Sequence, residues 1–361
     1  MSENLDNKYS FKRYDLADDK TLKAWSAADE YILETFDGLE SKPDHLAIYN
    51  DRFGFLACYL HSVIPTMIIT NKSQEKTIDR NLKANDLPMP HFANPLSVLD
   101  NKIDIAFVKI PKSLGLFQLF LEHITQNSTD DITVFCGFMT RYFTPNLLQI
   151  AQEYFEVVEQ SRAQKKARLL ILKKKKETVK KDMITSLTYK EQEYRQYQGV
   201  FSAEHIDYAT QFFLDHLEVK ETDQCILDLA SGNGVIGNEI FKKFPEAEIH
   251  LMDDSFLAVS SAELNIQGEH IHHHFNNDLS IFEDDTFDLI VTNPPFHFEY
   301  EINIQITLGL FRGCYKCLKV GGSLQVVANK HLYYKVHLER LFTTVQVLAV
   351  AKKFVVYKCA K

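Results

Sequence analysis

The sequence of 361 residues predicts an α/β protein made of two tandem domains, each a doubly wound, mostly parallel sheet that ends in an antiparallel hairpin. Three observations lead to this fold class. The chain is too long for one ordinary domain and suits two. Apolar, strand-like segments alternate with helical stretches, which is typical of parallel sheets covered by helices. The order of these segments in the first half is repeated in the second half.

The second half shows the alternation most clearly. Its strand candidates are 226–229, 248–252, 287–292, 323–328, 345–350 and 354–359. Helical stretches, for example 201–217 and 302–318, separate the earlier candidates. Only a few residues separate the last two candidates, so we expect them to pair as an antiparallel hairpin at the edge of the sheet.

The first half follows the same order. Its strand candidates are 45–49, 67–70, 104–110 and 132–136, and its terminal hairpin is formed by 155–160 and 168–172. Matching landmarks keep near-constant separations of 180, 184 and 187 residues, in the pairs Gly54 and Gly234, Asp104 and Asp288, and Lys166 and Lys353. This pattern indicates an internal duplication of one α/β domain. The alternative is that two unrelated α/β domains share a general rhythm.

The two copies differ where chemistry is expected. Residues 228–234 read Asp-Leu-Ala-Ser-Gly-Asn-Gly, whereas residues 48–54 read Ile-Tyr-Asn-Asp-Arg-Phe-Gly, with one glycine and bulky residues in the turn. Residues 293–296 read Asn-Pro-Pro-Phe, whereas residues 109–112 read Lys-Ile-Pro-Lys. The first half therefore keeps the scaffold without the site, and we expect it to bind and not to catalyse.

These differences give the expected domain limits. A degenerate domain that binds and does not catalyse is predicted at 1–182, and a catalytic domain at 199–361. The intervening segment 183–198 is polar and helix-prone, and we expect it to be the linker.

Composition excludes several classes of protein. The chain is 45% hydrophobic and 25% charged, as soluble globular proteins are. It has no run of eighteen apolar residues, so no membrane span is expected, and its polar N-terminus is no signal peptide. The six cysteines are scattered, which favours reduced thiols in a cytoplasm over disulfides. Neither the pair Cys314 and Cys317 nor the histidines of 270–274 suggests a strong metal site, so none is expected.

Charge is unevenly distributed. The formal net charge of -9 argues mildly against nucleic acid, because phosphate contacts need Lys and Arg. Positive charge is nevertheless concentrated in 162–181, where Glu177 is the only acid, and such a segment can bind RNA locally. The alternative is a solvated strand end and linker. The candidate RNA contacts are Lys165, Lys166, Arg168, Lys173, Lys174, Lys175 and Lys176.

The first chemical motif is the loop in 226–237, which follows a strand and opens a helix. Gly232 and Gly234 allow a tight turn and let the backbone approach a ligand. The helix that follows offers free N–H groups. The loop lacks the Lys-Ser/Thr pair of a phosphate-binding P-loop. By itself it fits a dinucleotide or a nucleoside, and the alternative is a tight turn without a ligand.

Acids and amides after the next two strands extend this site. Asp253, about twenty residues on, can accept hydrogen bonds from both hydroxyls of a ribose. Asp254 is the neighbouring candidate, and the alternative role for this pair is a helix N-cap. Asn277 and Asp278 follow a third strand, where an acceptor can reach an adenine amino group; a plain turn is the alternative.

The last motif is Asn293-Pro294-Pro295-Phe296, at the end of the 288–292 strand. A conjugated amine is a poor nucleophile because its lone pair is delocalised. The Asn293 side-chain oxygen and the Pro294 carbonyl can hold its hydrogens so that the lone pair faces a methyl donor. Neither proline has an N–H, so the loop presents acceptors and stays stiff. Phe296 can stack on a flipped base. A dinucleotide enzyme has no use for this tetrapeptide.

Taken with these motifs, the chain resembles the two-domain ribosomal RNA guanine-N2 methyltransferases over nearly its whole length. The resemblance rests on Gly199-Val-Phe-Ser202, the Asp-Leu-x-x-Gly-Asn-Gly loop and Asn-Pro-Pro-Phe-His297. The segments 25–31 and 108–112, with Val327-Ala-Asn-Lys-His331, look closest to the large-subunit branch.

The resemblance implies two Rossmann-like methyltransferase-fold domains, the N-terminal one degenerate, S-adenosylmethionine as cofactor, large-subunit (23S) ribosomal RNA as partner, and a bacterial cytoplasm. It implies cofactor roles for Asp228, Gly232, Gly234, Asp253, Asn277 and Asp278, and places Phe201 and Ser202 at the cofactor entrance. Without the resemblance, Ser202 could equally be a helix N-cap with Phe201 packed beside it.

One residue departs from the family pattern. The family usually has glycine where this chain has Ala230, and alanine fits there only if its φ is negative. Rival functions remain open: a small-subunit (16S) guanine-N2 methyltransferase, an adenine-N6 or glutamine-N5 amine methyltransferase, and a non-catalytic RNA-binding scaffold.

Overall fold

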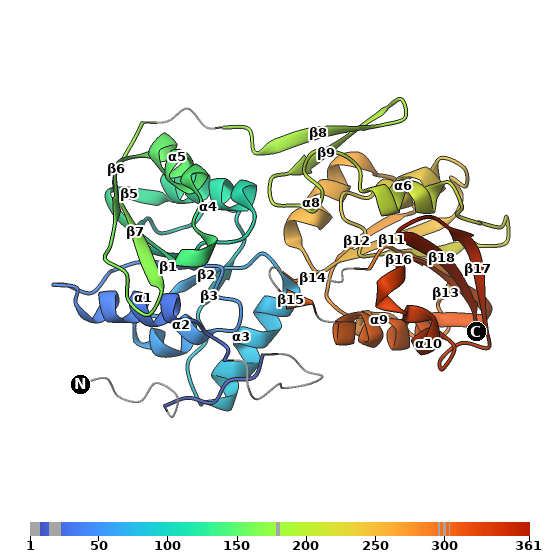
Figure 1. Cartoon of the computed structure of the whole chain (residues 1–361), viewed down its shortest axis with the longest axis horizontal. Helices are drawn as coiled ribbons and strands as arrows, with labels where there is room; N and C mark the ends of the chain where they lie inside the picture. The colour runs from blue at the N-terminus through green and yellow to red at the C-terminus, as the bar shows by residue number, and fades with distance from the viewer. Residues whose placement is uncertain (1–7, 14–22, 178–180, 295–296, 299–300, 303) are drawn as a thin grey trace. The chain divides into compact units, whose positions relative to one another are not determined.

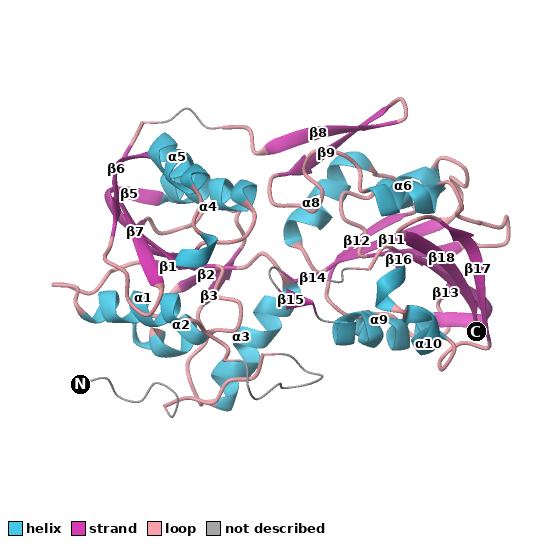
Figure 2. Ribbon diagram, in the orientation of Figure 1, coloured by secondary structure: helices cyan, strands magenta, loops and turns pink. Residues whose placement is uncertain are grey.

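The computed structural model describes residues 8–13, 23–177, 181–294, 297–298, 301–302 and 304–361. The chain divides into two compact units, Met1–Met183 and Ile184–Lys361. Each unit is a sheet with helices on both faces, as Figures 1 and 2 show.

The first unit contains a seven-stranded sheet in the order β3-β2-β1-β4-β5-β7-β6. Strand β7 runs antiparallel to β5 and β6, and the other pairs are parallel. The elements are α1 (Ala27–Asp37), β1 (Leu46–Tyr49), α2 (Phe55–Tyr59), η2 (His61–Val63), β2 (Thr66–Ile68), α3 (Lys72–Ala84), β3 (His91–Ala93), β4 (Ile103–Lys109), α4 (Leu114–Asn127), β5 (Ser128–Met139), η3 (Thr140–Tyr142), α5 (Pro145–Tyr154), β6 (Phe155–Gln160) and β7 (Ala167–Lys175).

The second unit repeats this topology in a sheet ordered β12-β11-β10-β13-β16-β18-β17, and adds two small antiparallel pairs, β8–β9 and β14–β15. Its elements are β8 (Ile184–Tyr189), β9 (Gln192–Tyr197), α6 (Tyr208–Leu214), β10 (Cys225–Leu229), α7 (Val235–Phe241), β11 (Glu248–Asp253), α8 (Phe256–Asn265), β12 (Ile271–Phe275), η4 (Leu279–Ile281), β13 (Phe287–Thr292), β14 (His297–Phe298), β15 (Glu301–Ile302), α9 (Ile304–Cys317), β16 (Leu318–Asn329), η5 (Lys330–Leu332), α10 (Tyr334–Leu338), β17 (Thr344–Val350) and β18 (Phe354–Ala360).

Strand β10 shows why the central strands carry apolar residues on both faces. Leu227 and Leu229 point into a buried cluster with Phe311 of α9, whereas Ile226 points into a cluster on the other face with Ile236 of α7. A strand that is covered on both faces favours apolar residues on each face and not only at alternate positions, and the buried Asp228 is the exception in β10. The matching strand orders of the two sheets confirm the predicted doubly wound fold, its duplication and both terminal hairpins.

The prediction of a helix-prone linker at 183–198 was wrong. Residues 184–197 form the hairpin β8–β9, which belongs to the second unit. Leu187, Tyr189, Tyr194 and Gln196 are buried, whereas most residues between them are exposed. This period of two is the signature of a half-buried strand, and the high polarity of the segment concealed it.

Two further details differ from prediction. The helical stretch expected at 201–217 is helical only over Tyr208–Leu214 in α6, because Asp207 is its N-cap. Strand β3 was not among the candidates, and the strand expected before Asn277 was given no limits; it is β12, which reads Ile-His-His-His-Phe and has little apolar character. None of the helices in the described ranges is long and apolar enough to cross a membrane.

Candidate cofactor and catalytic site

The sheet topology gathers the predicted motifs of the second unit at one edge. The glycine loop follows β10, Asp253 ends β11, Asn277 and Asp278 follow β12, and Asn293 follows β13. These strands are parallel neighbours, so their carboxyl ends lie side by side. The chain order reverses between β10 and β13, and such reversal points are where open α/β sheets bind ligands.

The loop after β10 is tightly wound. Gly232 and Gly234 have φ of 56° and 81°, and Gly234 is the N-cap of α7. A Cβ on Gly234 would lie 3.1 Å from both Ala262 and Leu251, so this glycine is needed for packing as well as for its backbone angle. A Cβ on Gly232 would meet nothing within 4 Å. The loop therefore presents bare backbone to open space at Gly232.

Ala230 does not meet the condition under which alanine would fit. Its φ is 59°, in the left-handed region that disfavours a Cβ. The loop is held in place on both sides of this residue, because the Ser231 N–H donates to the Met252 carbonyl at 3.1 Å. The substitution for the family's usual glycine therefore stores backbone strain in the loop.

Asp228 shapes the start of helix α7. It is fully buried, and its Oδ2 accepts the Gly237 N–H at 2.9 Å. Its Oδ1 has no hydrogen-bond partner among the described residues. Burial, with a smaller contribution from the Asp253 charge, raises the pKa of Asp228 to about 7. The orphaned oxygen is costly to leave unsatisfied, and a bound donor would relieve that cost.

Asp253 ties the loop after β10 to the end of β11. Its Oδ2 accepts the Gly232 N–H at 2.9 Å, and its Oδ1 accepts the Ser255 N–H at 2.8 Å. An ionised carboxylate has about four acceptor positions, so each oxygen can take one more donor. Burial raises the pKa of Asp253 to about 6, although the two backbone N–H groups oppose this rise.

Asn277 and Asp278 differ in what they bind within the chain. The Asp278 Oδ1 accepts the Ser280 N–H at 2.9 Å and caps the short helix η4. The side-chain oxygen of Asn277 has no hydrogen-bond partner among the described residues. Of the two, Asn277 is therefore the better candidate for an acceptor toward a ligand amine.

Asn293 is held by helix α6. Its Nδ2 lies 3.1 Å from the Asp207 Oδ2 and 2.9 Å from the Thr210 Oγ1. Pro294 is buried. Pro295 and Phe296 lie outside the described residues, so the predicted stacking role of Phe296 stays a prediction.

The entrance residues lie in the loop before α6. Phe201 is 72% exposed. Ser202 is not a helix N-cap: its Oγ donates to the His205 carbonyl, and its carbonyl accepts from the Gln196 side-chain amide at 3.2 Å. The Gln196 Oε1 in turn accepts from the Asn233 amide at 2.9 Å. Gln196 on β9 thus links the entrance loop to the glycine loop.

Sequence reasoning missed three residues of this site, namely Gln196, Asp207 and Thr210. Only Asp207 had a signal in the sequence, because an Asp directly before an apolar stretch is typical of a helix N-cap. Such a pattern does not show that the side chains of Asp207 and Thr210 contact Asn293.

Comparison with known proteins identifies the family. Residues 2–178 match the model described as the RLMG N-terminal domain, and residues 191–358 match the Methyltransferase small domain. A protein named "Ribosomal RNA large subunit methyltransferase G" from Serratia proteamaculans is 31% identical over 362 residues, covering 97% of this chain and 95% of the relative. One of the same name from Pectobacterium atrosepticum is 30% identical, covering 96% and 94%. This chain belongs to that family.

A solved structure agrees on the fold. The T. Thermophilus 16S rRNA N2 G1207 methyltransferase RsmC, described in complex with AdoMet and guanosine, has a TM-score of 0.77 and 21% identity, covering 93% of this chain and 92% of that one. Both units are therefore Rossmann-like methyltransferase folds. The methyltransferase domain matched by residues 191–358, in a family of ribosomal RNA methyltransferases, gives S-adenosylmethionine as the cofactor. The open space at Gly232, the spare acceptor capacity of Asp253 and the orphaned oxygen of Asn277 fit a nucleoside with a ribose and an adenine.

The basic segment is divided between the two ends of β7. Lys165 and Lys166 form the tight turn before the strand, with φ of 45° and 65°, and Lys173 to Lys176 end it. The two ends lie roughly 25 Å apart for a strand of this length. Four of the predicted contacts have partners within the first unit: Lys165 with Glu30, Arg168 with Gln160, Lys175 with Asp130, and Lys176 with the Gln152 carbonyl. The side chains of Lys166, Lys173 and Lys174 make no ion pair or hydrogen bond with the residues that the structure describes.

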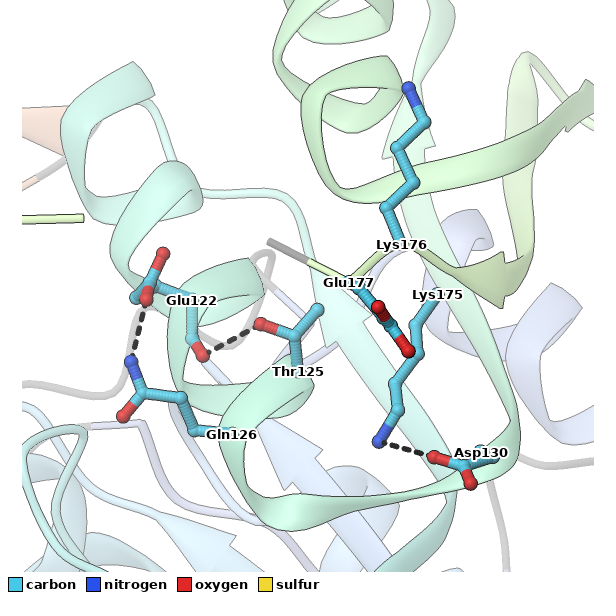
Figure 3. Close-up of a pocket in the computed structure, with 7 residues that line it drawn as sticks. All are labelled: Glu122, Thr125, Gln126, Asp130, Lys175, Lys176 and Glu177. Atoms are coloured by element: carbon cyan, nitrogen blue, oxygen red, sulfur yellow. Dashed lines mark hydrogen bonds and ion pairs between the residues drawn. The ribbon is translucent and has the colours of Figure 1, made fainter. Parts of the chain in front are cut away.

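A pocket of about 410 Å³ in the first unit lies beside the end of β7. Figure 3 shows the Lys175 ammonium directed into it toward Asp130. Its lining residues are Glu122, Thr125, Gln126, Asp130, Lys175, Lys176 and Glu177. Because carboxylates neutralise the lysines there, this pocket is not a concentrated anion site.

One group of potential metal ligands occurs in the described part of the chain. Cys225, Glu248 and His250 place one ligand atom each within 4.8 Å of one another. They lie near the amino ends of β10 and β11, whereas the cofactor loops follow the carboxyl ends of these strands. The group is therefore at the opposite edge of the sheet from the candidate site.

Proposed function

We propose that this chain transfers a methyl group from S-adenosylmethionine to the exocyclic N2 amine of a specific guanine in 23S ribosomal RNA. The observation that carries this proposal is Asn293, which stands beside the cofactor loop with its amide nitrogen already bonded inside the unit. The names of the large-subunit relatives support the RNA substrate.

For this reaction the chain must position a weak nucleophile, the exocyclic amine of guanine. The cofactor supplies an electrophilic methyl group on a sulfonium when bound. In our proposal the Asn293 Oδ1 and the Pro294 carbonyl accept the two hydrogens of the amine, which directs its nitrogen lone pair toward that methyl group. No base is needed before attack, because the nitrogen loses its proton only after it has become cationic. Phe296 would stack on the extruded base.

The proposed cofactor contacts follow the same edge of the sheet. Asp253 accepts from the ribose hydroxyls, Asn277 accepts from the adenine amine, and the bare backbone at Gly232 lets the cofactor approach the loop. Asp228 supports the loop through its bond to the Gly237 N–H, and Gly234 supports it as the N-cap of α7. Asp278 supports this turn as the cap of η4, and Phe201 and Ser202 stand at the entrance.

We further propose that the first unit captures RNA and does not take part in methyl transfer. Of the basic segment, Lys166, Lys173 and Lys174 are the exposed ammonium groups that we assign to phosphate contacts. Replacing Lys173 and Lys174 by Gln should weaken RNA binding and lower the log-log salt slope by up to about 0.7 to 0.9 per lost contact. Replacing Lys175 and Lys176 by Gln is the matched control, because the charge change is equal but both ammonium groups have partners in the unit.

The decisive experiment is nucleoside analysis after methyl transfer. The purified chain is incubated with S-adenosylmethionine and ribosomal RNA from a strain lacking it, and the products are digested and identified by mass. We expect N2-methylguanosine in the 23S fraction. The same nucleoside in 16S RNA would move the substrate to the small subunit. Methylated adenosine would make the acceptor an adenine N6, and methylated glutamine on added protein would make it an amide. If the chain neither binds the cofactor nor methylates any of these substrates, it is a non-catalytic RNA-binding scaffold.

A further inference from the structure

The amide nitrogen of Asn293 is fully used by helix α6. It carries two hydrogens, and two acceptors lie within hydrogen-bond distance of it, the Asp207 Oδ2 at 3.1 Å and the Thr210 Oγ1 at 2.9 Å. The donor capacity of the amide is thereby consumed inside the second unit.

This arrangement fixes which end of the amide faces the substrate. A carboxamide can be turned by half a rotation, which exchanges its oxygen and its nitrogen. An ionised carboxylate only accepts hydrogen bonds, so the turned amide would set its oxygen against the Asp207 oxygen and lose that bond, whereas the Thr210 hydroxyl can accept from the nitrogen or donate to the oxygen. The Asn293 Oδ1 is therefore kept on the side away from Asp207 and Thr210.

We propose that Asp207 and Thr210 are positioning residues, which hold the Asn293 amide with its oxygen toward the reacting amine. This inference rests on the proposed function. It explains how the site selects a substrate with an –NH2 group. The hydrogens of that group meet the Asn293 oxygen, which accepts hydrogen bonds, whereas the Asn293 nitrogen is bonded to α6 and does not face the substrate.

Both positioning residues are themselves held rigidly. Asp207 is the N-cap of α6, and its Oδ2 accepts the backbone N–H groups of Ala209 and Thr210 at 3.0 and 3.3 Å. Thr210 is 7% exposed. The same carboxylate oxygen therefore caps the helix and orients the catalytic amide, so a loss of capping must be separated from a loss of orientation.

The first test separates these two roles. Asp207→Asn keeps a good N-cap, because Asn and Asp cap equally well, but it removes the negative charge that repels the oxygen of a turned Asn293 amide. Thr210→Val removes the hydroxyl acceptor at nearly constant volume, and Thr210→Ser restores it. We expect turnover at saturating substrates to fall about tenfold or more in Asp207→Asn and severalfold in Thr210→Val, with recovery in Thr210→Ser. The dissociation constant for S-adenosylmethionine and the melting temperature should stay near those of the parent.

A matched control loses a helix cap elsewhere. Ser113 caps α4 in the first unit through the Leu116 N–H at 3.2 Å. Ser113→Ala should lower the melting temperature without changing turnover. If turnover in the α6 variants falls only in proportion to their melting temperature, Asp207 and Thr210 are structural and the proposal is wrong.

The second test uses charge. Asn293→Asp places a carboxylate about 3 Å from that of Asp207, where two like charges repel. The combined variant Asp207→Asn with Asn293→Asp leaves only one carboxylate, so this repulsion is removed. We expect the combined variant to be at least about tenfold faster than Asn293→Asp alone. Losses that simply multiply would overturn the proposal.

The outcome also distinguishes this proposal from the function on which it rests. Full turnover in Asn293→Ala would contradict the proposed function itself. Slow turnover in Asn293→Ala, together with parent turnover in Asp207→Asn and Thr210→Val, would sink only the positioning role.

Discussion

The two units share one topology, and both keep the glycine before the helix, Gly54 and Gly234, but they differ at most other positions where chemistry is expected. Strand register makes Ile48 the counterpart of Asp228 and Lys109 the counterpart of Asn293. It also places Ile69, directly after β2, where the second unit has Asp253. The sheet order is unchanged by these replacements, because it depends on the apolar strands and not on the loops. This comparison supports our proposal that the first unit keeps the methyltransferase fold without a cofactor site.

The first unit replaces its lost contacts with internal ones. Asp51, in the loop after β1, accepts the Ala57 N–H at 2.9 Å, which is the bond that Asp228 makes to Gly237 in the second unit. The Lys109 ammonium lies 2.9 Å from the buried carboxylate of Asp29 on α1. In the second unit the equivalent helix holds Asn293 through Thr210. An ion pair thus occupies the edge that the second unit keeps available for a ligand.

The largest expected effect follows from the pair Asn293 and Lys109. Asn293→Ala should lower turnover by roughly 10² to 10³, by analogy with the removal of one transition-state hydrogen-bonding group. Affinity for S-adenosylmethionine should barely change, because Asn293 faces the acceptor amine. Steady-state methylation of RNA with a titration of the cofactor measures both. Lys109→Ala is the control in the other unit, and a similar loss of turnover there would mean that the first unit contributes to catalysis.

The next effect concerns the acid that only the second unit has. Asp253→Ala removes an acceptor for two ribose hydroxyls and should weaken S-adenosylmethionine binding by about 1.5 to 3 kcal/mol, or roughly ten- to a hundredfold. Calorimetric titration of the full chain checks this value. An unchanged dissociation constant would move the ribose contact to Asp254 or elsewhere.

The same acid predicts a dependence on pH. The pKa of Asp253 is raised to about 6 in the unligated fold, chiefly by burial, so the group is protonated below that pH and loses acceptor capacity. Because the ionised form binds the cofactor, affinity should be constant above about pH 7 and fall about tenfold by pH 5. Asp253→Asn should bind weakly but without this dependence. Equal affinity of the parent at pH 5 and pH 7.5 would contradict the assignment.

The smallest expected effect concerns two residues with left-handed backbone angles, Ala230 in the loop before α7 and Asn50 in the loop before α2. Ala230 and Asn50 have φ of 59° and 62° at equivalent positions. Asparagine tolerates this region better than alanine does. Ala230→Gly should therefore raise the free energy of unfolding of the second unit by about 1 kcal/mol, whereas Asn50→Gly should lower that of the first unit, because it removes the hydrogen bond that the Asn50 amide donates to the Lys109 carbonyl at 3.1 Å. Urea unfolding measures both, and a destabilised Ala230→Gly would show that the loop is unstrained in solution.

The sequence alone determined the fold class, the duplication and the edge of the sheet at which the motifs of the candidate site meet. It could do so because apolar runs set the strands, and motifs that follow parallel strands must meet at one edge. Tertiary structure decided three matters that no local pattern contains. The polar segment 184–197 became a hairpin because alternate side chains pack on the second unit. Ala230 adopted a positive φ because the loop is fixed on both sides. Asn293 acquired its orientation from Asp207 and Thr210, more than eighty residues away in sequence, because only the folded chain brings a helix N-terminus against the end of β13.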